Sequence, residues 1–400
     1  MALRAYFAPC GMGLGHVARC EVVLERLREH GPVKAYFATY NEGLSYVQAS
    51  ASSGLRGLRI PSLEVVMKKN GEVDVERTLL KMTPRLVKIV GGQLAHDLSY
   101  MLSIQPDVVV SDTRAVAVLA AKALGLPCAC ILNQVRIYIP RKRRMLRASR
   151  LAEAGIIALL GQIWLLADEL FVPDFPEPFT ISSMNLKVPE RFKRKLRLVG
   201  PILARKPEDL PGREELKEKL GFEPDEPLVF VPISGPVRER AYFAEVIINV
   251  LSKLKDEFQA LISLGEPGRE RELARDYGPL KIFNWVRDFY ACLKACDVAI
   301  VRGGHGTVTK CMAYGRPMLV VPPPSHTEKM MNALRAKEVG VAKVLLQKRL
   351  SAKNVRRAIK ELLEGGEHER RLREAERRAA ELDAAGEIAR AVLRLAGGPK

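Results

Sequence analysis

The chain has 400 residues, and at about 100 to 200 residues per domain this length predicts two domains or one large one. Hydrophobic residues make up 48% of the sequence, which is enough for real cores and excludes disordered and fibrous proteins. The formal net charge of +18 points to anionic partners such as phosphates, nucleic acid or an acidic membrane surface.

The positive charge is concentrated in two stretches. Residues 113–152 contain nine Lys or Arg and no acid, and residues 187–206 contain eight against the single Glu190. We interpret the first stretch as a strip that faces a membrane and the second as charge near a cleft that holds a diphosphate. Because residues 141–150 have no aromatic side chain between the cations, the run is unlike a single-strand nucleic-acid site.

Cysteine spacing and hydropathy indicate the compartment. The seven cysteines are scattered without a CxxC pair, which predicts a reduced interior rather than a structural zinc site. No secretory signal pattern opens the sequence, and the longest uncharged apolar stretch, 154–167, falls short of the ~20 residues that span a bilayer. We therefore expect a cytoplasmic protein, at most peripheral on the inner face of the cell membrane. The low Asn and Gln content hints at a heat-adapted source.

The first half of the chain alternates predicted strands and helices. A strand ends in a glycine turn, and apolar residues then recur at helical spacing from Val17 to Leu27. Further predicted elements are strands at 33–39 and 58–60, a helix at 75–102, a strand at 108–110, a helix at 115–124 and a strand at 128–132. Strands that alternate with helices predict a parallel sheet with function at the carboxyl ends of the strands.

A second series follows a predicted hinge at 198–201. The expected elements are strands at 228–233, 259–264, 281–285, 298–301 and 318–321, with a helix at 241–255 and another after 307. The same order of elements thus occurs twice. The fold class predicted is α/β, with two Rossmann-like domains that face each other across a cleft. The tail at 351–395 is helical with mixed charges, which favours a solvated face over a binding tail.

Two glycine clusters follow strands and open helices, at 11–15 and 303–306. There the missing side chains let backbone N–H groups and the positive helix end approach a phosphate. The first cluster lacks the G-x-G-x-x-G spacing of the dinucleotide fingerprint, and no acid ends the second strand.

His16 and Asp112 are the candidate catalytic pair. His16 begins the helix after the first cluster, where an imidazole can take a proton from a hydroxyl; local capping or packing is the alternative. Asp112 follows a strand of the same predicted sheet and can orient such a base, although the segment Ser111-Asp112-Thr113 equally fits a helix N-cap.

These residues carry a resemblance to a known superfamily. The segments 13–16, 111–112, 124–127 and 199–201 resemble the N-terminal half and linker of the two-domain GT-B glycosyltransferases. The segments 284–288, 295–298, 302–307, 314–317 and 322–333 resemble the nucleotide-sugar motif of the same superfamily. It includes the UDP-glucuronosyl and plant natural-product transferases and the bacterial N-acetylglucosaminyl transferase of lipid-linked peptidoglycan synthesis, of the family 28 type.

The resemblance implies a domain organisation and a reaction. Residues 1–198 would form an acceptor-binding domain, residues 199–365 a donor-binding domain, and residues 366–400 a helical tail that packs back on the N-terminal domain. A hexosyl group would pass from a nucleotide-diphosphate sugar, UDP-sugar first among them, to an acceptor hydroxyl with inversion. His16 would be the general base and Asp112 its orienting carboxylate. The pattern implies no cofactor and no metal, which fits the absence of an Asp-x-Asp sequence.

The resemblance also assigns donor-binding positions. Those expected to contact the donor or its phosphates are Gly13, Gly15, Ser234, Gly235, Trp285, Val286, Arg287, Arg302, Gly303, Gly304, His305, Gly306, Thr307, Glu328 and Lys329. One position departs from the pattern: Lys310 stands where relatives carry a Glu that accepts hydrogen bonds from the ribose. An ammonium accepts none, so the nucleotide stays open.

A basic run leads into the apolar stretch. The candidate membrane and acceptor patch consists of Arg141, Lys142, Arg143, Arg144, Arg147, Arg150 and Trp164. Cations beside an apolar segment with Trp suit an anionic membrane, which favours a lipid or lipid-linked acceptor. The alternative is a basic loop before a buried helix. Two other functions also stay open: a nucleotide-sugar 2-epimerase on the same fold, and, less favoured, a nucleic-acid-binding protein.

Overall fold

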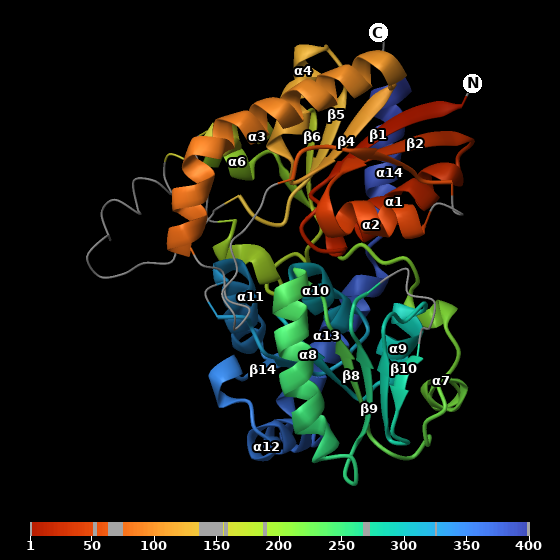
Figure 1. Ribbon diagram of the computed structural model, residues 1–400. Coiled ribbons are helices and arrows are strands. Elements are labelled where there is room, and N and C mark those ends of the chain that lie inside the picture. Colours follow the sequence, from red (N-terminus) through yellow and green to blue (C-terminus); the bar gives the residue numbers. More distant parts are fainter. Residues whose placement is uncertain are drawn as a thin grey trace.

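The protein, described here by a computed structural model, consists of two lobes stacked one above the other (Figure 1). The structure describes residues 2–50, 54–62, 75–135, 155, 159–186, 190–266, 273–324 and 326–397. Each lobe is built on a seven-stranded sheet, with strand order β3-β2-β1-β4-β5-β6-β7 in the first and β10-β11-β9-β8-β12-β13-β14 in the second. Neighbouring strands are parallel except for the antiparallel pair β10–β11. The predicted fold class, two Rossmann-like α/β halves, is confirmed.

Strands from the first half of the chain form the first sheet, and strands from the second half form the second sheet. The first sheet contains β1 (Leu3–Pro9), β2 (Val33–Thr39), β3 (Arg56–Arg59), β4 (Val108–Asp112), β5 (Cys128–Ile131), β6 (Glu169–Val172) and β7 (Leu196–Leu198). The second contains β8 (Leu228–Pro232), β9 (Gln259–Ser263), β10 (Leu273–Asp276), β11 (Leu280–Phe283), β12 (Val298–Val301), β13 (Met318–Val320) and β14 (Ala342–Val344). In the first sheet β4 lies beside β1, and Asp112 pairs with Pro9. Residues that follow these two strands therefore meet at one sheet edge.

Helices cover the sheets on the connections between strands. In the first lobe they are α1 (Gly15–Arg28), α2 (Asn41–Ala49), α3 (Val75–Ile104), α4 (Ala115–Ala123) and α6 (Glu190–Lys193). Later in the chain come α7 (Arg213–Lys219), α8 (Val237–Ser252), α9 (Phe289–Ala295), α10 (His305–Ala313), α11 (Thr327–Glu338), α12 (Ala352–Leu363), α13 (Glu367–Ala380) and α14 (Ala384–Gly397). The apolar spacing of α1 buries one face, and Val17, Val23 and Leu27 are fully buried.

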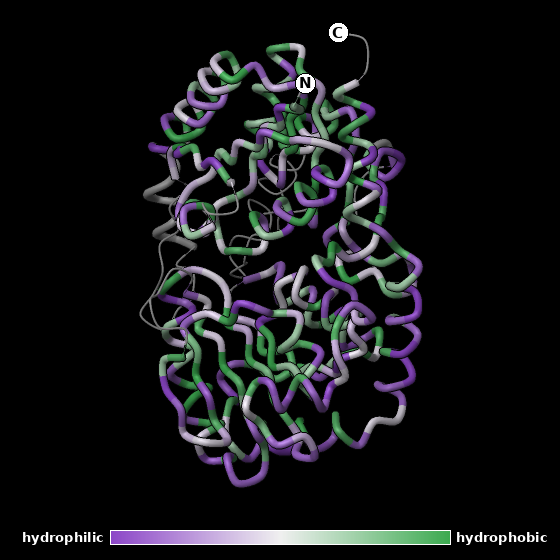
Figure 2. Tube along the Cα trace, turned by 90° about the vertical axis from the view of Figure 1, so that its right-hand side faces the viewer, coloured by the Kyte–Doolittle hydropathy of each residue, from purple (hydrophilic) through white to green (hydrophobic). Residues whose placement is uncertain are grey.

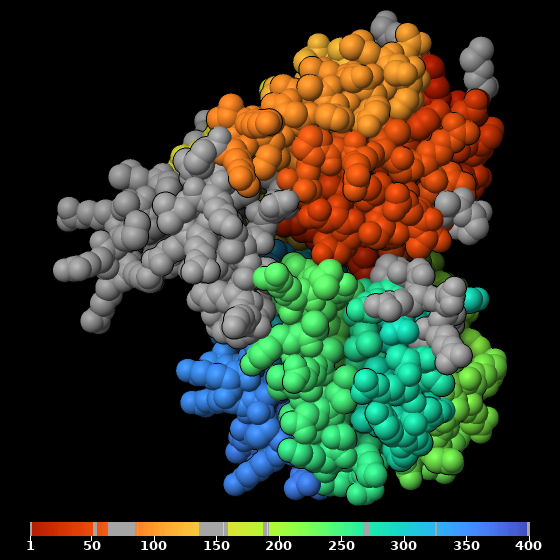
Figure 3. Space-filling model, viewed as in Figure 1, coloured from red at the N-terminus to blue at the C-terminus, as the bar shows by residue number. Residues whose placement is uncertain are grey.

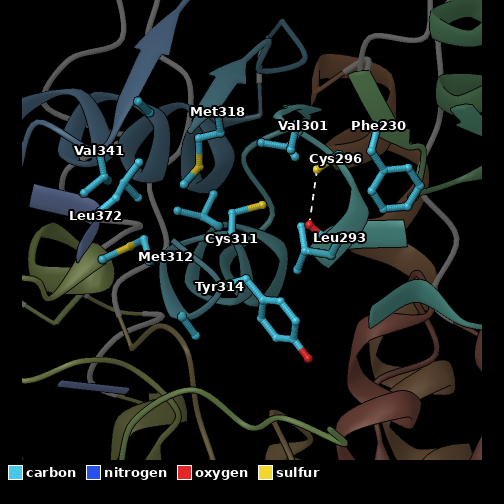
Figure 4. Close-up of a cluster of buried hydrophobic side chains, with 14 of the residues drawn as sticks. Phe230, Leu293, Cys296, Val301, Cys311, Met312, Tyr314, Met318, Val341 and Leu372 are labelled. Carbon is cyan, nitrogen blue, oxygen red and sulfur yellow. Dashed lines mark hydrogen bonds between the residues drawn. The ribbon is translucent and has the colours of Figure 1, made fainter. Parts of the chain in front are cut away.

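Each sheet carries apolar side chains on both faces, so each lobe has its own core. Figure 2 shows the hydrophobic segments gathered inside the two lobes. In the second lobe Phe230, Cys311 and Met318 belong to one buried cluster, in which the Cys296 thiol donates to the Leu293 carbonyl at 3.3 Å (Figure 4). The buried cysteines of the chain behave as small apolar side chains, and all seven are free.

The chain crosses between the lobes more than once. After β6, residues 174–186 leave the first sheet, and Phe175, Phe179 and Ile181 pack into a core cluster of the second lobe. Near the end, α13 packs against α10 in the second lobe, whereas α14 returns to the first lobe and packs against α1 (Figure 1). Ala385, Ile388 and other small side chains of α14 join the first core. The predicted helical tail therefore divides between the lobes.

The structure also differs from the predicted elements at several points. The helix α2 and the strands β6, β7 and β14 lie in segments for which no element is predicted, because each is short and carries a weak periodic pattern. The strand predicted at 108–110 extends through Asp112, so that this residue belongs to the sheet itself. The N-cap of α4 is Arg114. The alternative role of Asp112 as a helix cap is therefore wrong.

Candidate active site

Three connections at the carboxyl edge of the first sheet bring polar side chains together. His16 lies in the first turn of α1, Asp112 is the last residue of β4, and Asn133 lies two residues after β5. His16 Nδ1 is 2.7 Å from Asp112 Oδ1. The structure thus places the two predicted catalytic residues in direct contact, in the arrangement of a base and its orienting carboxylate.

Asp112 is fully buried, and its charge is compensated on both oxygens. Arg19 Nε donates to Oδ2, and Arg19 Nη2 donates to Oδ1 at 2.5 Å. The hydroxyl of Thr113 also donates to Oδ1, at 3.0 Å. Burial by itself would raise the pKa of Asp112, but the charges of Arg19 and His16 outweigh it and hold this pKa well below its usual range. Asp112 is therefore an ionised carboxylate at neutral pH.

Arg19 and Asn133 belong to this cluster although the sequence analysis does not single them out. Arg19 lies three residues after His16 on α1, so both side chains share one helix face, and this spacing is the signal that could have identified Arg19. Asn133 accepts from Arg19 Nη2 at 2.7 Å and donates to Glu328 of the second lobe at 3.3 Å. Its position just after a strand is the only sequence signal for it.

The second glycine loop joins β12 to α10. Gly303 has φ +78°, and a Cβ there would lie 2.6 Å from the carbonyl oxygen of Lys329, so the turn requires glycine. Gly304 is the N-cap of α10 and makes no side-chain cap. Among the described residues, and leaving aside its chain neighbours and the backbone of its own helix, no heavy atom lies within 4 Å of a Cβ built on Gly304 or Gly306. The helix end, with Thr307 in its first turn, thus faces open space in which an anion can approach the backbone N–H groups.

Arg302 and His305, predicted to add charge to this loop, are buried and engaged with the protein. Arg302 donates to the carbonyl oxygen of Val321 at 3.1 Å and to Gln347 at 2.7 Å. His305 Nε2 lies 3.0 Å from Asp174 Oδ2, a close contact whose angles do not meet those of a hydrogen bond. Both side chains therefore contact buried groups of the protein rather than the open side of the loop.

A buried ionic cluster holds the neighbouring predicted donor positions. Glu239 of α8 lies 2.8 Å from Lys329 Nζ and 3.6 Å from Arg302 Nη2. Burial would raise the pKa of Glu239, but Lys329 and Arg302 lower it overall. Gly235 packs against this pair, since a Cβ there would lie 3.3 Å from Glu239 and 3.4 Å from Lys329. Ser234 is half-buried at the same turn.

The remaining predicted donor positions lie near the junction of the lobes. The ring of Trp285 meets that of Tyr46 edge to face across the junction, with centroids 6.2 Å apart. Val286 is buried and Arg287 is exposed. The ammonium of Lys310 lies over the rings of two aromatic residues of α9, 5.3 Å from the centroid of Phe289 and 5.1 Å from that of Tyr290.

The first glycine loop resembles the second in its openness. Gly13 has φ +82°, and nothing lies within 4 Å of a Cβ built on Gly13 or Gly15. A cavity of about 1110 Å³ adjoins this loop between the lobes, lined by Leu14 and Tyr40 on one side and Val237 and Arg240 on the other. Figure 3 shows the junction of the lobes from the side of α8. Neither His16 nor the 302–307 loop is among the residues that line this cavity, so the chemistry of its residues identifies the site.

The structure describes the two basic stretches of the sequence to different extents. The basic residues 141–150 lie outside the described residues. Trp164 is 2% exposed and packs in the first core, so the expectation that it contributes to a surface patch is wrong in this structure. In the second stretch Arg197 pairs with Glu169 and Glu387, and Arg205 pairs with Asp288, so the charge expected near a diphosphate is neutralised within the protein at these positions.

The described part of the chain contains neither a membrane-spanning helix nor a cluster of metal ligands. None of its helices combines the length and apolar character needed to span a membrane. No three His, Cys, Asp or Glu side chains within it come together as ligands for a metal ion.

Comparison with known proteins identifies the class. Residues 238–388 match the model of the glycosyltransferase family 28 C-terminal domain, and residues 4–159 match that of glycosyl transferase family 1. An uncharacterized glycosyltransferase of Methanosarcina acetivorans is 26% identical, with 94% of this chain and 93% of the relative covered.

Two further relatives are similar in part or in fold. The UDP-N-acetylglucosamine–N-acetylmuramyl-(pentapeptide) pyrophosphoryl-undecaprenol N-acetylglucosamine transferase of Rubrobacter xylanophilus is 31% identical over 46% of this chain and 53% of the relative. The crystal structure of the glycosyltransferase VinC in complex with dTDP superposes with a TM-score of 0.60 at 18% identity, covering 98% of this chain and 99% of that one. With matches to both lobes and along nearly the whole chain, the protein belongs to the GT-B glycosyltransferases.

Proposed function

We propose that this glycosyltransferase moves a hexosyl group from a nucleoside-diphosphate sugar to an acceptor hydroxyl, with inversion at the anomeric carbon. The contact between His16 Nδ1 and Asp112 Oδ1 carries the proposal. Because an ionised carboxylate only accepts, a proton on Nδ1 satisfies this 2.7 Å contact and leaves the other ring nitrogen, Nε2, to accept the proton of the attacking hydroxyl. Attack from the face opposite the leaving diphosphate would invert the anomeric centre.

The donor would be held by the second lobe. The open N-terminus of α10 offers the backbone N–H groups of Gly304 and Gly306 and the hydroxyl of Thr307 to the diphosphate, whereas the Thr307 N–H donates to the Gly304 carbonyl. Because fixed donors of this kind can stabilise the leaving diphosphate, the proposal includes turnover without a divalent metal. Transfer that is unchanged by a chelator would support this part, and transfer that stops until a metal is restored would refute it.

Replacing the proposed base tests the reaction. His16→Ala should lower the rate of transfer by about 10²- to 10⁴-fold, because a general base contributes that much, while donor affinity stays the same. His30→Ala is the matched control, since His30 is exposed near the end of the same helix. Full turnover by His16→Ala would remove the assignment. Release of an epimerised nucleotide sugar without any acceptor would favour the 2-epimerase instead.

A substitution at Gly304 tests the phosphate loop separately. Because Gly304 has φ −63° and open space around it, Gly304→Val should leave the fold intact yet place a side chain where the diphosphate would lie. Donor affinity measured by calorimetry should fall at least tenfold. Gly212→Val is the control, because Gly212 also caps a helix in open surroundings. Equal donor affinity in both variants would contradict the assignment of the loop.

The nucleotide and the acceptor form the finer part of the proposal. We take UDP as the first donor nucleotide and dTDP, which VinC binds, as the second. In a thermal-shift screen the better ligand should stabilise the protein more, since stabilisation follows affinity. A lipid-linked acceptor is proposed from the basic run 141–150 and from the partial match to the pyrophosphoryl-undecaprenol transferase. Sedimentation with anionic but not neutral vesicles would support this acceptor class, and equal sedimentation with both would count against it.

A further inference from the structure

The guanidinium of Arg19 lies at the centre of the cluster around the base. It is 8% exposed, and it donates to both oxygens of Asp112 and to the side-chain oxygen of Asn133. Its Nη2 atom also lies 3.0 Å from His16 Nδ1. One side chain therefore contacts the base, the carboxylate that orients it, and the amide that reaches the other lobe.

These contacts constrain the proton on His16. If Nδ1 carries a proton, it donates to Asp112 Oδ1 at 2.7 Å, and the nearby Arg19 Nη2 makes no bond with it. If Nδ1 were bare, its lone pair would face a carboxylate oxygen at that distance, which is repulsive. The first state is therefore favoured. In that state the guanidinium of Arg19 and the carboxylate of Asp112 both lie beside the ring.

The other titratable groups around the pair do not replace this effect. Cys20, whose thiol lies 3.9 Å from Asp112 Oδ2, and Cys130 of β5 are fully buried. Burial raises the pKa of both thiols well above the usual range, so both are neutral. Glu328 of α11 is the remaining charged group, and Asn133 stands between it and Arg19. Arg19 is thus the cation of the described cluster that directly compensates Asp112.

We propose that Arg19 is a positioning residue that cancels the charge of Asp112, so that this carboxylate orients His16 without holding it in the protonated, inactive form. Asn133 anchors the guanidinium on the side of the second lobe. The inference rests on the proposed function in so far as His16 is the base. It adds a buried cation to the pair formed by the base and its orienting carboxylate.

Removing the charge should change the titration of His16. In Arg19→Met the uncompensated Asp112 would favour the imidazolium, and protonation of His16 should persist to a pH about 1 to 3 units higher. Arg19→Lys keeps the positive charge but not the fork of donors, so in this variant His16 should titrate near its wild-type pH. Arg26→Met is the control, because Arg26 lies on the same helix and pairs with Glu29 away from the site.

The experiment follows the reaction of His16 with diethyl pyrocarbonate, which attacks only the neutral ring, by peptide mass spectrometry over a pH series. It needs no substrate, so it separates this inference from the proposed function. The acid limb of the pH–rate profile for transfer should shift by the same amount in Arg19→Met. A shifted modification profile together with absent hexosyl transfer in the wild type would support the role of Arg19 and refute the proposed reaction.

A second variant guards against loss of the fold. Arg19→Met leaves Asp112 buried without a cation, whereas Arg19→Met/Asp112→Asn removes both charges and should fold more readily. In the double variant the titration of His16 should return to within about half a pH unit of the wild type, because the two charges cancel in both proteins. Equal titration of His16 in wild type and Arg19→Met, or a double variant that titrates like Arg19→Met, would overturn the inference.

Discussion

The buried carboxylate of Asp174 binds the segment that connects the two lobes, so its removal tests how that segment is held. It follows β6 and accepts from the backbone N–H groups of Phe175, Ile181 and Ser182 at 2.8, 3.2 and 2.7 Å. The Ser182 hydroxyl also donates to it at 2.5 Å, and His305 of the second lobe lies 3.0 Å away. One side chain thus shapes the segment that crosses from the first sheet into the second core.

Asp174→Ala removes the acceptor of four buried donors. At about 1 kcal/mol for each donor left unsatisfied, the low end of the usual range because water can enter the space, the loss is about 4 kcal/mol. Asp276→Ala is the matched control, since Asp276 is exposed and accepts from one backbone N–H, that of Gly278 at 2.9 Å. We expect less than about 1 kcal/mol there.

Urea unfolding followed by tryptophan fluorescence measures the effect. The two tryptophans report on different places, Trp164 in the first core and Trp285 at the junction of the lobes. Asp174→Ala should lower the urea midpoint far more than Asp276→Ala and should broaden the transition, because the lobes would unfold less cooperatively. Equal midpoints for the two variants would refute the role assigned to Asp174.

The pH dependence follows from the sign of the pKa shift. Burial would raise the pKa of Asp174, but His305 and the Ser182 donors outweigh it, so this pKa is lowered on folding. The ionised Asp174 therefore stabilises the folded protein fully above its unfolded-state pKa of about 3.9, and this stabilisation is lost as the pH falls below that value. The difference in stability between wild type and Asp174→Ala should shrink from about pH 5 to pH 2. A difference that stays constant over this range would contradict the shift.

Three further changes probe the folds of the two lobes. In Gly303→Ala the backbone would keep φ +78°, which strains an alanine, and the new Cβ would lie 2.6 Å from the Lys329 carbonyl oxygen. Both the melting temperature and the donor affinity should therefore fall. An unchanged melting temperature would contradict this account. Phe7→Ala removes a fully buried ring whose centroid lies 4.8 Å from that of the stacked Phe37 ring. The free energy of unfolding measured in urea should fall by about 3 to 5 kcal/mol, and a fall of less than about 1 kcal/mol would contradict the prediction. Ala389→Asp places a charge in the fully buried face of α14 and should expose the first lobe to proteolysis, whereas intact resistance would show that α14 is dispensable there.

Several features of the fold and site could be predicted from the sequence because they depend on neighbouring residues. Short apolar, aromatic runs mark β1 and β2, and helical spacing marks α1, since strands and helices impose their periods on the local sequence. Gly303 stands at the turn where the structure requires a glycine. The position of His16 after a glycine turn, and of Asp112 after an apolar run, was enough to nominate both.

Only the tertiary structure decided which side chains meet. Asn133 and Glu328 are 195 residues apart in the chain, and Asp174 and His305 belong to different lobes. No periodic pattern encodes such contacts, because they depend on strand order and on how the lobes dock. The same holds for charge: Arg197 and Arg205 count toward the +18 that the sequence shows, yet each is paired with an acid from a distant segment. The sequence determined the class of fold and the residue types of the site, whereas the packing determined which charges remain free to act.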